Sequence, residues 1–81
     1  MQERISPPLG AYHVHAFSTR SDPQGWLACG QTWVTGADGQ PLLLAEVNSG
    51  PHDSESVAVD RAYERAYADT LRLLLREFVC L

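Results

Sequence analysis

Residues 53–81 read DSESVAVDRAYERAYADTLRLLLREFVCL, the longest run of the sequence with a single regular pattern. Ala, Leu, Arg and Glu dominate it and no Gly or Pro interrupts it, which favours one long helix. Asp53 or Ser54 can cap the free amides of the first turn, so we predict a helix from Ser54 to about Val79. At about 100° per residue, its apolar residues gather into a stripe that faces the core. This stripe contains Val59, Ala62, Tyr63, Ala66, Tyr67, Leu73, Leu74 and Leu81, with Thr70 among them.

Two further groups of side chains lie off this stripe. Four of the six basic residues share the opposite face of the helix, where they form an arginine stripe of Arg61, Arg65, Arg72 and Arg76. A second apolar row is confined to the C-terminal half and consists of Leu71, Leu75, Phe78 and Val79. The end of the helix is therefore apolar nearly all round.

Three upstream segments, residues 11–19, 26–35 and 41–48, are predicted to be strands because of their alternation, their length and the turn residues that bound them. The turn sequences SDPQG and GADGQ separate them, and SGPH precedes the helix. Residues 1–10 lack periodicity and contain Ser-Pro-Pro, so we expect a flexible arm. The sequence thus predicts an α+β domain over residues 11–81, a three-stranded antiparallel meander with the helix packed on one face.

The alternation assigns side chains to the two faces of this sheet. Small residues, namely Ala16, Ala28, Gly30 and Ala45, are expected to lie opposite Ala62 and Ala66, with Tyr12, Val14, Leu43 and Val47 around them. The other face, which nothing is predicted to cover, would carry Phe17, Leu27, Trp33, Leu42 and Leu44.

The expected lengths of the elements leave part of the helix without a partner. Strands of about eight residues span roughly 26 Å, whereas the helix would be roughly 39 Å long. The second apolar row would lie on this overhang. A homodimer would cover either the overhang or the open sheet face. The alternative is a monomer in which the N-terminal arm folds over the sheet or the twist of the strands reduces the exposure.

Composition restricts the classes of partner. The net charge is −4 and every basic residue is Arg, so the protein as a whole repels phosphate backbones and anionic membranes. The N-terminus lacks the apolar core of a signal peptide and no 18-residue apolar run is present, so we expect a cytoplasmic protein without a membrane anchor. Cys29 and Cys80 lack zinc-ligand spacing, and we expect reduced thiols rather than a disulfide.

His13 and His15 form an HxH pair whose imidazoles could share a metal ion. Cys29, Glu46 and His52 are candidate additional ligands. We favour the simpler interpretation that the two histidines are surface residues of an alternating strand. Because no feature places a nucleophile beside a base, we expect neither catalytic activity nor a cofactor.

The arginine stripe also has two interpretations. It could bind nucleic acid, a phosphorylated ligand or an acidic protein. Alternatively, Glu64 and Asp69 lie three or four residues from these arginines and pair with them on a solvated face, which we favour. The expected element order is similar to the later part of double-stranded RNA-binding domains. That family opens its helix with lysines, whereas residues 53–57 are here acidic, DSESV.

The sequence therefore predicts a small non-catalytic protein-interaction module that self-associates and has a regulatory or inhibitory use. A nucleic-acid-binding domain that uses the arginine stripe is the first alternative. A metal site at the HxH pair is the second.

Overall fold

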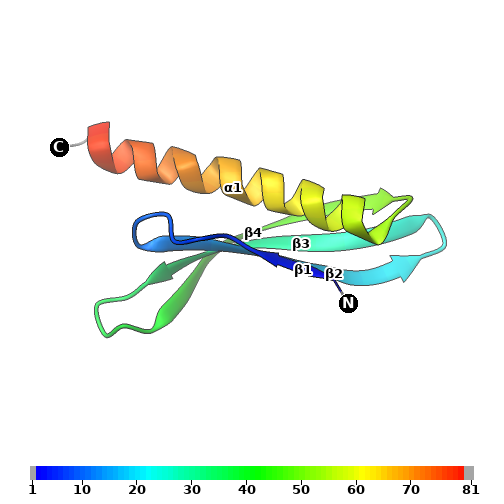
Figure 1. Ribbon diagram of the computed structural model, residues 1–81, viewed down its shortest axis with the longest axis horizontal. Helices are drawn as coiled ribbons and strands as arrows, with labels where there is room; N and C mark the ends of the chain where they lie inside the picture. The colour runs from blue at the N-terminus through cyan, green and yellow to red at the C-terminus, as the bar shows by residue number, and fades with distance from the viewer. Residues whose placement is uncertain (1, 80–81) are drawn as a thin grey trace.

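The computed structural model describes residues 2–79, apart from the side chains of Asp22, Phe78 and Val79. The elements follow in the order β1 (Glu3–Ile5), β2 (Tyr12–Asp22), β3 (Gly25–Thr35), β4 (Pro41–His52) and α1 (Glu55–Val79). The strands pair antiparallel in the order β1-β2-β3-β4, and α1 lies across one face of the sheet (Figure 1). The predicted α+β class, antiparallel sheet and single C-terminal helix are confirmed.

The sheet has four strands rather than the predicted three, because part of the expected N-terminal arm pairs with β2. The Arg4 guanidinium lies 3.1 Å from the Asp60 carboxylate on α1. The Ser6 amide donates to the Val14 carbonyl, and the Ser6 hydroxyl accepts from the Val14 amide, both at 2.9 Å. These contacts hold β1 in place although its three residues, Glu3–Ile5, are too few to show a periodic pattern.

The predicted helix is confirmed, and Ser54 caps it. The Ser54 hydroxyl accepts from the Val57 amide at 3.1 Å, and the Ser54 carbonyl accepts from the Ala58 amide at 3.1 Å. Glu55 places a carboxylate in the first turn and Arg76 a guanidinium in the last, as the helix dipole favours.

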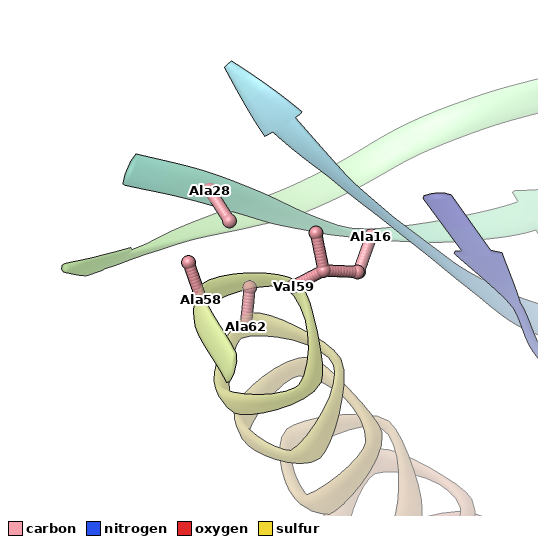
Figure 2. Packing of buried hydrophobic residues seen from close by; sticks show 5 residues of the cluster. All are labelled: Ala16, Ala28, Ala58, Val59 and Ala62. Atoms are coloured by element: carbon pink, nitrogen blue, oxygen red, sulfur yellow. The ribbon is translucent and has the colours of Figure 1, made fainter. Parts of the chain in front are cut away.

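The core between α1 and the sheet is built from small side chains. Figure 2 shows Ala16 of β2 and Ala28 of β3 pointing toward Ala58, Val59 and Ala62 of the helix. As predicted, small residues on both sides let the helix approach the sheet closely. The approach at Gly30 is so close that a methyl group there would overlap the Ala62 carbonyl oxygen.

A buried pair of hydroxyls continues this contact toward the C-terminus of the helix. Thr32 Oγ1 lies 2.9 Å from Thr70 Oγ1, and the Thr70 hydroxyl donates to the Ala66 carbonyl at 2.7 Å. Since a hydroxyl has one proton, Thr32 must donate to Thr70. Both polar groups are thus satisfied inside the core.

A bulge in β4 changes the assignment of its first residues to faces. Thr32 pairs with Ala45, but Trp33 pairs with Leu43, so one extra residue of β4 is accommodated there. Leu43 consequently shares the face of Trp33, and Leu42 pairs with Val34 on the other face. The predicted alternation, with Leu42 beside Trp33 and Leu43 toward the helix, holds only from Ala45 onward. A single inserted residue has no signature in the pattern of apolar residues.

The strands are also longer than predicted. β2 and β3 have 11 residues each and β4 has 12. At roughly 3.3 Å per residue, β2 spans about 36 Å, close to the length of about 37 Å for a 25-residue helix. The length difference that suggested an overhang is therefore absent. The start of β2 contacts the C-terminal half of α1, where the Tyr12 hydroxyl donates to Glu77.

Candidate functional site

The sheet face opposite α1 has no covering layer within residues 2–79, and we call it the open face (Figure 1). Strand register brings together Phe17, Trp33 and Leu27, as predicted, although Leu42 turns to the other face. Trp33 and Phe17 remain partly exposed. The register and contacts add Glu3, Ile5, His13, His15, Cys29, Gln31, Leu43 and Glu46 to this face.

A chain of hydrogen bonds orients the centre of the open face. The Trp33 indole donates to Gln31 Oε1 at 3.1 Å, and Gln31 Nε2 donates to Glu46 Oε2 at 3.3 Å. The His13 ring is parallel to the Trp33 ring within 6°, with 6.3 Å between centroids. The indole of Trp33 is thus held in one orientation, which limits its conformational freedom on the surface.

Cys29 ends this chain, since its thiol donates to Glu46 Oε2 at 3.2 Å. Burial of the sulfur, followed by the hydrogen bond to Glu46 and its negative charge, raises the pKa of Cys29 to about 11. The thiol is therefore protonated at neutral pH. Because the thiolate is the form that attacks electrophiles and binds metals, this environment suppresses both kinds of chemistry.

The two histidines of the HxH pair contact different side chains. His13 stacks on Trp33, whereas His15 Nε2 lies 2.8 Å from the Glu3 carboxylate. His52, a candidate third ligand, instead lies 2.9 Å from the Ser49 hydroxyl. Among the residues that the structure describes, no three His, Cys, Asp or Glu side chains are close enough together to hold a metal ion.

Three members of the arginine stripe have partners within the chain. Arg61 pairs with Glu64 at 3.3 Å and Arg72 with Asp69 at 3.0 Å, three residues apart in each case. Arg65 instead donates to the Asn48 carbonyl on β4 at 2.8 Å. Arg76, the fourth member, lies in the last turn of α1. The Glu64 and Asp69 carboxylates thus offset two of the four positive charges.

Of the second apolar row, Leu71 and Leu75 are exposed on α1. The side chains of Phe78 and Val79 lie outside the part of the chain that the structure describes. Three exposed apolar residues, Ile5, Leu43 and Val57, were not among the predicted surface residues. Ile5 lies in the segment that was expected to be a flexible arm. The sheet face on which Leu43 lies depends on the bulge in β4.

A groove of about 510 Å³ lies where two strand irregularities flank the start of β3. Its lining consists of Thr19, Arg20, Leu27, Ala28, Asn48, Ser49 and Gly50. Leu27 belongs to the open face, so the groove adjoins the same surface. The sequence did not indicate it, because it arises from breaks in strand register.

Comparison with known proteins gives no match to a family model, to a curated protein or to a solved structure. A functional proposal therefore rests on the geometry of the chain. A search of residues 2–79 for a helix with the length and apolar character to cross a membrane finds none.

Proposed function

We propose that this chain is a non-catalytic protein-interaction module that self-associates. The observation that carries the proposal is an inversion of side-chain size between the inside and the outside of the fold. Among the residues that the structure describes, the largest fully buried side chains are only Val14 and Thr70. The exposed large apolar residues in the same part of the chain are Ile5, Leu42, Leu43, Leu44, Val57, Leu71 and Leu75.

The energetic consequence of this inversion is considerable for a small domain. Full burial of a leucine or isoleucine is worth about 1.5–3 kcal/mol, and alanine contributes far less because it carries a single methyl group. The fold thus leaves much of its apolar side-chain area in water. A partner that covered these residues would recover that free energy, which is why large exposed apolar patches mark interaction sites.

Side chains suited to chemistry are, by contrast, engaged within the fold. The Cys29 thiol is protonated and bonded to Glu46, and His13 and His15 have separate partners. These polar side chains are therefore bonded within the chain. The large apolar side chains, by contrast, remain exposed and available to the surface of another protein. This division supports an interaction module over an enzyme or a metal site.

Sedimentation equilibrium tests the self-association. We expect the mean mass to rise from the 8.9 kDa of one chain toward twice that value with increasing concentration. A range from about 1 μM to about 1 mM covers weak and moderate dimers. A mass of one chain at every concentration would contradict the proposal.

A further inference from the structure

We propose that the groove beside Leu27 binds a small aliphatic carboxylate, whose charged group pairs with Arg20 while its apolar body packs on Leu27. This inference goes beyond the proposed function, because it assigns a ligand rather than a protein partner. The groove has a volume of about 510 Å³. This volume lies within the range of about 300–1,000 Å³ that is usual for sites of small molecules.

Two breaks in strand register shape the groove, one on each side of Leu27. On β2, Thr19 is an extra residue, because its two neighbours along the chain pair with Ala28 and Leu27. On β4, residues 50 and 51 both lie opposite Leu27. An extra residue bends its strand and increases the local twist. The groove is therefore part of the backbone geometry and does not depend on the rotamer of one surface side chain.

Among the described residues that line the groove, Arg20 carries the only charge. Arg4, Arg61 and Arg72 each pair with a carboxylate, but no described carboxylate contacts the exposed side chain of Arg20. The groove is thus a local site of positive charge in a chain whose net charge is −4. A cation at a concave surface attracts anions from solution.

A carboxylate fits this site better than a phosphate. The planar guanidinium presents paired N–H groups that match the two oxygens of a carboxylate. One arginine also balances the single charge of a carboxylate, whereas a phosphate dianion would retain excess charge beside an acidic protein. Thr19 on β2 and Asn48 on β4 add a hydroxyl and an amide to the lining, and both groups can donate hydrogen bonds to an anion.

Leu27 supplies an apolar surface next to the guanidinium. Leu27 pairs with Arg20 in the register of β2 and β3, and directly opposite residues have Cβ atoms about 4.5–5.5 Å apart. The Leu27 side chain is half-buried and lies against the backbone of Gly50, where an added Cβ would come 2.9 Å from Leu27 Cδ2. A short aliphatic group can thus pack on Leu27 while the attached carboxylate is held by Arg20.

Titration with isocaproate, a short branched carboxylate, tests the site by NMR of the isotope-labelled chain. We expect the amide signals of Thr19, Arg20, Leu27 and Ser49 to shift together, with a dissociation constant of about 1–20 mM for so small a ligand. Isocaproamide has the same shape without the charge. It should bind at least about tenfold more weakly, because hydrogen bonds between charged groups are the stronger ones.

Two arginine substitutions locate the positive charge. Arg20→Gln removes the guanidinium from the groove, so we expect the dissociation constant for isocaproate to rise at least about tenfold. The matched control is Arg76→Gln, because Arg76 is also exposed but lies in the last turn of α1. This control removes the same charge and should leave the constant within about twofold of the wild type. The comparison of isocaproate with its amide needs no substitution, so it decides the question even if Arg20→Gln does not fold.

The outcomes separate this site from the self-association. Shifts that require the carboxylate, disappear in Arg20→Gln and persist in Arg76→Gln support the site. Equal binding of isocaproamide, unchanged binding in Arg20→Gln or tighter binding of inorganic phosphate would overturn it. So would the absence of any shift up to about 100 mM isocaproate. None of these results bears on the proposed self-association, which the solution mass of the chain decides separately.

Discussion

Thr32 and Thr70 show how one buried pair of side chains can join β3 to α1. In Thr70→Val the Thr32 hydroxyl loses its acceptor inside the core, so we expect a loss of about 1–3 kcal/mol in the free energy of unfolding. In the double variant Thr32→Val, Thr70→Val no hydroxyl is left unsatisfied, and the loss should be smaller than in Thr70→Val alone. Urea unfolding of the four proteins measures the difference. Additive losses would contradict the paired arrangement.

Cys29 makes stability depend on pH in a defined direction. The pKa of the Cys29 thiol is about 11 in the folded chain, against an ordinary value of 9.0 for a solvated thiol. Between these values the unfolded chain has lost a proton that the folded chain keeps, so the free energy of unfolding falls as pH rises. At pH values well below 9.0, the contribution of Cys29 to the free energy of unfolding is fully present. The hydrogen bond to Glu77 raises the pKa of Tyr12 as well. The titration of Tyr12 therefore also lowers the free energy of unfolding as pH rises.

We expect the urea midpoint of the wild type to fall between about pH 8 and about pH 11, and to fall less in Cys29→Ser. Serine keeps a donor for Glu46 at nearly the same size and does not titrate in this range. Tyr12 contributes equally to both proteins and cancels in the comparison. Identical declines would show that Cys29 titrates alike in the folded and unfolded chains.

At the scale of elements, the position of α1 on the sheet depends on Gly30. A Cβ at this position would overlap the Ala62 carbonyl oxygen and lie 3.1 Å from the Ala66 Cβ. Backbone cannot move aside as a side chain can, so we expect Gly30→Ala to cost about 3 kcal/mol, the upper end for overpacking.

Gly39→Ala is the control for this substitution. Its Cβ would meet nothing within 4 Å, but its φ of +81° lies in the left-handed region. The expected loss is about 1 kcal/mol, from backbone strain alone. Thermal or urea unfolding ranks the two variants, and a smaller effect at Gly30 than at Gly39 would contradict the close approach of helix and sheet.

The elements also show what the sequence can and cannot predict. The helix was predictable almost to the residue, because its cap at Ser54 and its apolar stripe are local features. β1 was not, because it is held by residues far away in the chain, such as Asp60, 56 positions from Arg4. The prediction of the sheet face on which Leu42 and Leu43 lie was wrong for a related reason. A bulge is set by strand pairing and not by the alternation of side chains.

The candidate surfaces, too, were predictable only where they depend on local sequence patterns. Alternation was enough to bring Phe17 and Trp33 to one face, whereas the hydrogen-bonded chain from Trp33 to Cys29 depends on cross-strand register. Sequence patterns therefore predict which residues share a face, and strand pairing decides which of them contact one another.

For the whole molecule, the central claim is that its missing apolar layer is supplied by another copy. The small core packs helix and sheet closely, but it leaves the leucines of β4 and the open face outside. A second copy packed against these side chains would remove part of this apolar area from water.

Sedimentation equilibrium of the wild type beside Trp33→Glu and Leu75→Glu tests this claim most directly. We expect the mass of the wild type to rise from 8.9 kDa toward twice that value with concentration, and at least one of the two variants to keep the mass of one chain, because a charge then replaces an apolar side chain of the contact. If the wild type keeps the mass of one chain at every concentration, no second copy supplies the layer and the account is wrong.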